Sequence, residues 1–206
     1  MRAIQKGREP QSLTHHRATT HANYDNYQHS DELRAALVAE QHGICCYCMQ
    51  RIRPHADSMK IEHWHCRDHY PTEQLDYGNL LGACKGNEGQ PGKEQHCDTH
   101  KGNLALSRNP ATPAHRVEEL VRYLGDGRIT SSDAQFTQEL DKVLNLNLAF
   151  LIKNRKAVLD GFIQSLPAAG TLSKAIWQKK LKEWSEAPEM REYCGVVLYW
   201  LRKKLK

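Results

Sequence analysis

The sequence lacks any long apolar run. The longest stretch, residues 194–201, is far shorter than the roughly 20 residues that a membrane-spanning helix needs, and residues 1–6 do not contain the apolar segment of a secretory signal. Aromatic residues make up only 7%, but 39% of the 206 residues are hydrophobic and 26% are charged, which is typical of a folded globular protein. We therefore expect a cytoplasmic protein, with no membrane partner, of one large or two small domains.

The cysteines are clustered rather than spread along the chain. Five of the seven fall between Cys45 and Cys84, a sixth follows at Cys97, and eleven of the twelve histidines lie in the first hundred residues. A disulfide framework would space its cysteines more evenly, so this concentration predicts a metal site.

Charge is distributed unevenly between the two parts of the chain. Residues 1–110 contain 13 basic and 13 acidic side chains, whereas residues 111–206 contain 16 basic and 11 acidic ones, so the whole net charge of +5 lies in the second part. Two interpretations remain: a face that binds phosphates, or a solvated helical surface rich in lysine.

Periodicity divides the chain into three parts and predicts an α+β protein. Residues 1–29 show neither helical nor strand periodicity and are interpreted as an extended arm. In residues 30–110, Ser30 would cap a helix ending near Gly43, and a strand-like run covers 59–64. Because residues 45–103 otherwise have little apolar patterning, we expect a metal to hold them.

Residues 111–206 are predicted to be mainly helical and to bind a partner or nucleic acid. A hairpin is expected around Asp126 and Gly127, followed by a helix capped by Ser132 and ending near Leu144. Helical spacing then predicts three more helices, over 148–163, over 172–184 and over 190–205.

Four cysteines form the predicted zinc site. Cys45 and Cys48 are a C-x2-C pair, and Cys84 and Cys97 can add the two further thiolates that tetrahedral zinc prefers. The twelve residues between the second pair are rich in glycine and can loop out. Cys46 and Cys66 are kept as replacement ligands.

The segments between these cysteines resemble the HNH, or ββα-metal, nuclease motif. Glu62 and His63 end the strand-like run, Asn79 lies in DYGNLL, and CDTHKG closes the segment at residues 97–102. The resemblance implies a fold of two strands and a helix that holds one divalent cation, Mg2+ or Mn2+, against the scissile phosphate.

The same resemblance implies a role for each matching residue. His63 would be the general base that deprotonates water, with an imidazole titrating near neutrality, and Glu62 would be a hard oxygen ligand of the cation. Asp98, favoured over His100, would be the second ligand. Asn79 would fasten the loop that orients His63, and Lys101 would neutralise phosphate charge.

A wider set of motifs resembles the PtuB family, the nucleases of Septu-type anti-phage systems. The motifs are MRAIQKG (1–7), CCYC (45–48), KIEHW (60–64), NLLGAC (79–84), HCDT (96–99), KG (101–102) and LNLN (144–147). The resemblance implies a bacterial defence complex with a PtuA-like ABC-type ATPase and a nucleic acid substrate, either DNA or an RNA such as tRNA. Some family members are retron effectors, which adds a retron reverse transcriptase and its DNA/RNA product as a partner.

The chain departs from this family after Trp64, and several other features have an interpretation unrelated to the nuclease motif. After Trp64 the family continues towards Pro-Gln, whereas this chain has His65 and Cys66, which we expect at the surface. His15, His16, His21 and His29 are expected to be surface or partner contacts rather than a second metal site. Trp177, Trp184 and Trp200 are expected to pack in the core or an interface rather than to stack on bases. Two interpretations remain for the basic end Arg202, Lys203 and Lys204, a contact with nucleic acid or a solvated C-terminal turn. The rival functional hypothesis is a non-catalytic zinc adaptor, in which Glu62, His63 and Asp98 would be incidental.

Overall fold

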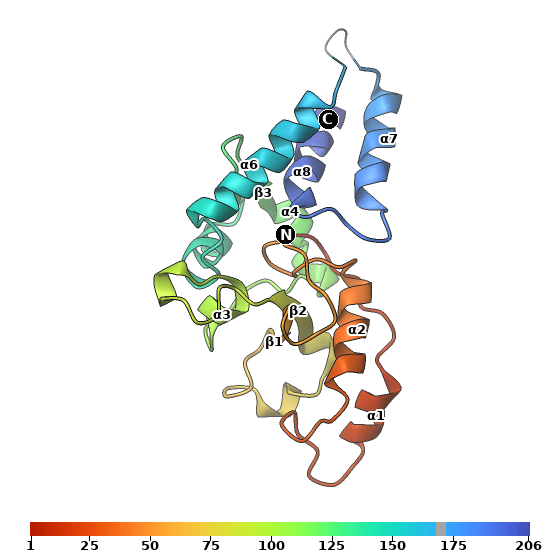
Figure 1. Cartoon of the computed structure of the whole chain (residues 1–206), viewed down its shortest axis with the longest axis vertical. Helices are drawn as coiled ribbons and strands as arrows, with labels where there is room; N and C mark the ends of the chain where they lie inside the picture. Colours follow the sequence, from red (N-terminus) through yellow and green to blue (C-terminus); the bar gives the residue numbers. More distant parts are fainter. Residues whose placement is uncertain (168–171) are drawn as a thin grey trace.

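The computed structural model describes residues 1–167 and 172–206. Figure 1 shows the N-terminal elements at one end of an elongated molecule and the three long C-terminal helices at the other. The elements of the first half are α1 (Gln11–Arg17), α2 (Ser30–Glu40), β1 (Met59–His63), β2 (Leu80–Cys84) and α3 (Cys97–Lys101). Those of the second half are α4 (Val117–Leu120), β3 (Val121–Tyr123), β4 (Ile129–Ser131), α5 (Ala134–Gln138), α6 (Ala149–Gln164), α7 (Lys174–Ser185) and α8 (Cys194–Leu205).

The N-terminal segment is not extended throughout, which corrects the expectation for residues 1–29. Helix α1 lies within it, and its Leu13 is fully buried against Leu33 and Leu37 of α2. A seven-residue helix with a single buried apolar residue has too weak a periodicity to be recognised from sequence. Helix α2 was predicted correctly, but Ser30 is its first helical residue and not its cap.

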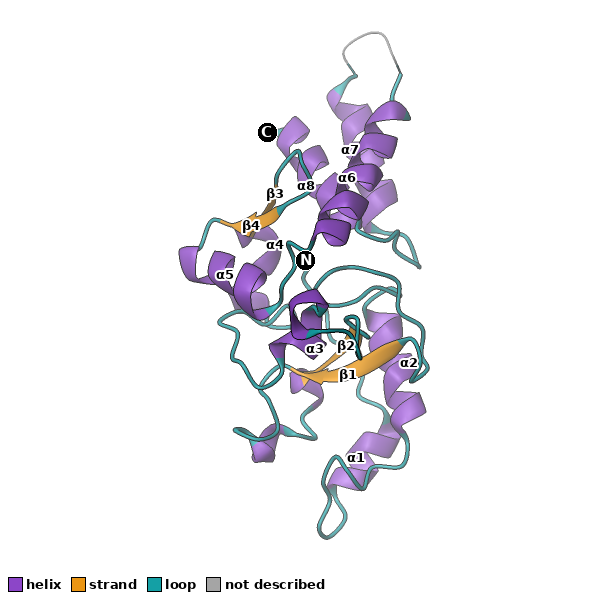
Figure 2. Cartoon of the chain, turned by 60° about the vertical axis from the view of Figure 1, so that its left-hand side comes forward, coloured by secondary structure: helices purple, strands orange, loops and turns teal. Residues whose placement is uncertain are grey.

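An antiparallel hairpin and a short helix form the middle of the first half. Strand β1 pairs with β2 so that Met59 lies opposite Cys84 and His63 lies opposite Leu80. Helix α3 follows in the chain and contacts β2, as Figure 2 shows. The chain order is therefore strand, strand, helix.

The segment around the hairpin has more apolar core than its patterning predicted. Tyr47, Met49, Ile52, Met59 and Leu81 are all buried in the larger core cluster, which continues into the C-terminal helices. Tyr47, Met49 and Ile52 lie on a turn and the irregular chain after it, so their burial left no repeating signal in the sequence.

The second half follows its predicted pattern with local changes. Strands β3 and β4 form the expected hairpin, but residues 117–120 are a helical turn, and Asp133 rather than Ser132 caps the next helix by accepting a hydrogen bond from the Phe136 amide at 3.0 Å. After α5 the chain continues as a π-helical turn, Glu139–Val143.

The C-terminal helices are joined by aromatic packing. Phe162 of α6 contacts Trp184 of α7 and Trp200 of α8 edge to face, and Trp177 contacts Trp200 at 5.5 Å between ring centres. The expectation that these tryptophans serve packing is confirmed. None of the helices in residues 1–167 and 172–206 combines the length and apolarity needed to cross a membrane.

Candidate functional site

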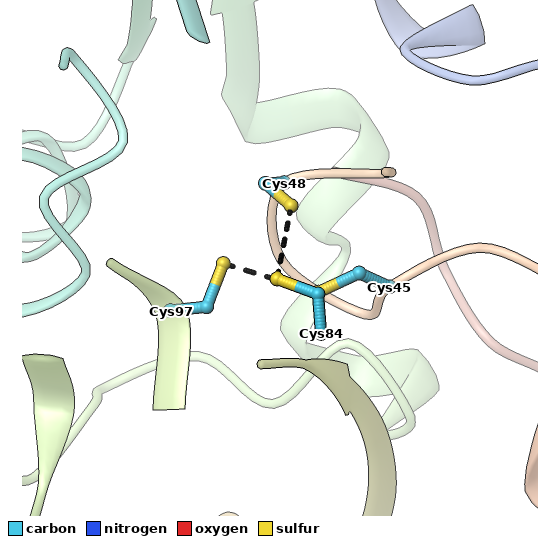
Figure 3. A group of neighbouring side chains, drawn as sticks. All are labelled: Cys45, Cys48, Cys84 and Cys97. Atoms are coloured by element: carbon cyan, nitrogen blue, oxygen red, sulfur yellow. Dashed lines mark hydrogen bonds between the residues drawn. The ribbon is translucent and has the colours of Figure 1, made fainter. Parts of the chain in front are cut away.

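The four predicted zinc ligands come together in the fold. The sulfur atoms of Cys45, Cys48, Cys84 and Cys97 all lie within 4.8 Å of one another, and all four residues are buried (Figure 3). The sulfurs of Cys48 and Cys84 are 3.6 Å apart and those of Cys45 and Cys97 are 3.9 Å apart. Zinc bonds to sulfur of about 2.3 Å place neighbouring sulfurs about 3.8 Å apart in a tetrahedron, so the cluster fits zinc.

Three separate segments bring these thiols to one point. Cys45 and Cys48 lie on a tight turn in which the Cys45 amide donates to Gln50 O at 2.8 Å. Cys84 is the last residue of β2, and Cys97 is the first of α3, with its amide donating to Leu144 O at 2.9 Å. A metal at this point would therefore fasten the turn, the hairpin and the helix together.

Ionisation of the cluster depends on a cation. Burial raises the pKa of Cys48 and of Cys97 well above the usual range of a thiol. Burial also opposes ionisation of Cys45, but hydrogen bonds from the surrounding thiols outweigh it and lower its pKa. Four buried thiolates would repel one another, so a divalent cation is the chemistry that this donor set suits.

Cys46 and Cys66 are not part of the cluster. Both are nevertheless buried, at 3% and 7% exposed, so the surface position expected for Cys66 is wrong. The Cys66 carbonyl accepts a hydrogen bond from the Tyr70 amide in a turn that covers it. Among the described residues, His15, His16, His21 and His29 are not grouped with other metal-binding side chains.

A second polar cluster lies between β1 and α3. The carboxyl groups of Glu62 and Asp98 lie within hydrogen-bonding reach of each other. The Tyr47 hydroxyl donates to Glu62 Oε1 at 2.7 Å and Lys101 Nζ lies 3.0 Å from the same oxygen. Lys60 Nζ lies 3.0 Å from Asp98 Oδ2. Each carboxyl group thus has one oxygen held by the protein and one oxygen without those partners.

The pKa values of the two carboxyl groups are shifted in opposite directions. Burial, together with the charge of Asp98, raises the pKa of Glu62 well above its usual range. Burial also opposes ionisation of Asp98, but the hydrogen bond from Glu62 and the charge of Lys60 outweigh it and lower its pKa. At rest the pair therefore favours a proton on Glu62.

His63 ends β1 beside this cluster. Its Nε2 lies 3.0 Å from Gln74 O, and its ring contacts the Tyr24 ring edge to face at 4.5 Å. A carbonyl oxygen can only accept, so Nε2 carries the proton and Nδ1 carries the lone pair. Burial lowers the pKa of His63 to about 4, which corrects the expectation of titration near neutrality.

Asn79 fastens the chain that follows His63. Its Oδ1 accepts from the His65 amide at 2.7 Å, and its Nδ2 donates to His65 O at 3.0 Å and to Glu73 O at 3.3 Å. Its own carbonyl accepts from the Trp64 amide at 3.0 Å. The buried amide therefore ties both sides of His65 to the start of β2.

Of the two remaining predicted residues, Lys101 reaches Glu62 and His100 does not. Lys101 is 1% exposed, and besides Glu62 it contacts the His63 carbonyl at 3.2 Å. His100 points elsewhere, with its Nδ1 2.9 Å from Val143 O. The structure thus brings Asp98, and not His100, to Glu62.

Sequence reasoning missed two residues of this cluster. Lys60 lies two positions before Glu62, and side chains two apart on a strand share a face, so strand alternation could have found it. Tyr47 lies between the knuckle cysteines, and only the folded turn brings its hydroxyl to Glu62. No pattern in the sequence reveals that contact.

Comparison with known proteins gives one distant relative. No protein-family model matches the chain. The chain is similar to the Septu protein PtuB of Bacillus thuringiensis. The two are 24% identical over 177 residues, which cover 80% of this chain and 66% of that protein, just under two thirds of its length. This similarity supports the resemblance to the PtuB family that the motifs indicated.

Proposed function

We propose that the chain is a metal-dependent HNH endonuclease, the effector of a Septu-type anti-phage complex with a PtuA-like ABC-type ATPase. The observation that carries the proposal is the meeting of the Glu62 and Asp98 carboxyl groups beside His63. These groups lie on a strand, strand, helix unit that the cysteine cluster fastens. The similarity to the Septu protein PtuB gives the proposed biological setting.

His63 is the proposed general base. With Nε2 donating to Gln74 O, its Nδ1 lone pair can accept a proton from water, and the lowered pKa keeps the imidazole neutral at physiological pH. Asn79 is a positioning residue, because it clamps the backbone two residues beyond His63. Tyr24 packs on the ring and limits its rotation.

Glu62 and Asp98 would hold the divalent cation through the two oxygens that Tyr47, Lys101 and Lys60 leave unengaged. One or two carboxylates plus substrate phosphate are the usual ligands of Mg2+, so this donor set fits it. When bound, the cation stabilises charge on the phosphate and the leaving oxygen. Lys60 and Lys101 hold the carboxyl groups in place and add positive charge near the phosphate.

The chemistry defines the substrate only as a phosphodiester, in DNA or in an RNA such as tRNA. The ATPase, and in a retron setting the reverse transcriptase with its DNA/RNA product, are proposed partners by analogy with the PtuB family. Residues 111–206, with their excess of basic side chains, are the part proposed to contact partner or nucleic acid.

The decisive experiment compares cleavage of labelled DNA and of total RNA by the chain with its ATPase partner, with and without Mg2+. The unaltered protein should cut DNA or RNA, and only when Mg2+ is present. The His63→Ala variant should cut about 100-fold more slowly or slower still, because that is the usual contribution of a general base. His55→Ala, which removes an exposed histidine of the same segment, should retain full activity. Equal behaviour of His63→Ala and the unaltered chain would favour the zinc adaptor instead.

A further inference from the structure

Three rings lie in contact on the segment that follows His63. The His65 and Tyr70 rings are stacked at 4.1 Å with an interplanar angle of 14°, and the Trp64 ring lies 4.1 Å from His65 on a 31° tilt. Two rings at that distance cannot share one face of an imidazole, so His65 lies between the other two. We call Trp64, His65 and Tyr70 the ring stack.

The ring stack is held rigidly and is attached to the proposed active site. Asn79 bonds both the amide and the carbonyl of His65, and Glu73 Oε2 lies 2.7 Å from His65 Nδ1. His65 is two residues from His63, and the same asparagine is proposed to position both. A platform whose backbone and ring are already fixed loses little entropy when a ligand stacks on it.

Tyr70, the outer ring of the stack, is partly exposed. It is 39% exposed and is one of the few large hydrophobic side chains at the surface of the described residues. One of its faces lies on His65, so its exposed surface belongs to the other face and the ring edges. A partly exposed tyrosine pre-stacked on a fixed imidazole is the kind of surface on which a nucleic acid base stacks.

A cation lies on the same segment. The Arg67 guanidinium lies 4.9 Å over the ring of Tyr24, which itself contacts His63. Its partner Asp25 is 80% exposed, and an ion pair of that kind exchanges easily for a phosphate. Arg67 and the ring stack thus supply charge for a phosphate and a surface for a base next to His63.

We propose that the ring stack binds an unpaired base beside the scissile phosphate, so that the chain prefers single-stranded or unpaired nucleic acid over a continuous duplex. This inference rests on the proposed function, and it adds a substrate class and residues outside the HNH motif. Bases in a duplex stack on each other and offer no free face to a protein ring, whereas an unpaired base does.

The test measures binding, without cleavage, by the full chain in buffer without added Mg2+ or Mn2+. Fluorescence anisotropy would compare a labelled single-stranded oligonucleotide with a duplex of equal length. Tyr70→Ala should weaken single-strand binding about tenfold, the loss of one base–aromatic stack, while Tyr70→Phe should bind as the unaltered chain does. The control His55→Ala removes another exposed ring of residues 30–110 to which no role in binding is assigned, and it should change nothing.

A second readout reports stacking itself. An oligonucleotide carrying 2-aminopurine should lose fluorescence on binding, and Tyr70→Ala should restore it. Equal affinity for duplex and single strand, no measurable single-strand binding, or unchanged binding by Tyr70→Ala would each overturn the inference. Tyr70-dependent binding together with no Mg2+-dependent cleavage would count against the proposed nuclease activity and leave the base platform standing.

Discussion

Replacing Cys97 by serine should weaken zinc binding and destabilise the whole chain. Cys97 is fully buried, its sulfur lies 3.9 Å from that of Cys45, and it joins α3 to the cluster. Structural zinc contributes about 10–16 kcal/mol of binding free energy in zinc-finger peptides, so one ligand of four corresponds to about 2.5–4 kcal/mol. For a chain of this size each kcal/mol lowers Tm by about 2–4 °C, which predicts a drop of roughly 10 °C.

The assay would measure zinc content by elemental analysis and unfolding by calorimetry. Cys66→Ser is the matched control, because Cys66 is also buried but lies outside the cluster, and it should retain its zinc. Because the cysteines belong to the same core cluster as the C-terminal helices, we expect one cooperative transition for the unaltered chain. If Cys97→Ser binds as much zinc and melts at the same temperature as Cys66→Ser, the zinc assignment is refuted.

Three further predictions follow from the polar groups. The pKa of His63 is about 4 in the folded chain against an ordinary 6.5, so the unfolded chain takes up the proton first as the pH falls, and the folded state loses stability. Between pH 6.5 and pH 4.5 the denaturant midpoint of the His63→Gln variant should therefore fall less than that of the unaltered chain. Asn79→Ala removes three hydrogen bonds and should cost about 3 kcal/mol in urea unfolding, whereas an unchanged midpoint would show that the clamp contributes nothing. Calorimetric titration should detect weak binding of Mg2+ to the free chain and tighter binding when a non-cleavable oligonucleotide is present. Equal affinities would contradict the expected coupling between cation binding and nucleic acid binding.

Residue type and spacing in the sequence predicted the cysteine ligands and Asp98. The thiols could be assigned because two cysteines separated by two residues can bind one metal, and Cys84 and Cys97 supply the two further thiolates that tetrahedral zinc prefers. Asp98 was assigned by its position after the last cysteine, and the structure brings it to Glu62. Strand β1 falls within the strand-like run predicted over residues 59–64.

Other features depend on contacts between distant segments and could not be predicted. The Tyr47 contact with Glu62 requires the knuckle turn to fold against β1, and the lowered pKa of His63 requires its burial beneath Tyr24 and the chain at Gln74. Helix α1 forms because Leu13 finds a buried place on α2. In each case tertiary packing decides a property on which the local sequence is silent.

The charges around Glu62 constrain how a cation can enter. Two carboxyl groups face two lysines, Lys60 and Lys101, so the fully ionised cluster is neutral. Glu88 lies 3.5 Å from Lys60 but is paired with Lys85 at 2.6 Å, so this pair adds no net charge. The raised pKa of Glu62 adds a proton and makes the resting cluster positive. A divalent cation alone must displace that proton and would still leave excess positive charge at a buried place, which is costly. A phosphodiester brings a negative charge of its own. Cation and nucleic acid should therefore each strengthen the binding of the other, and this reciprocal coupling would keep the site inactive until substrate arrives.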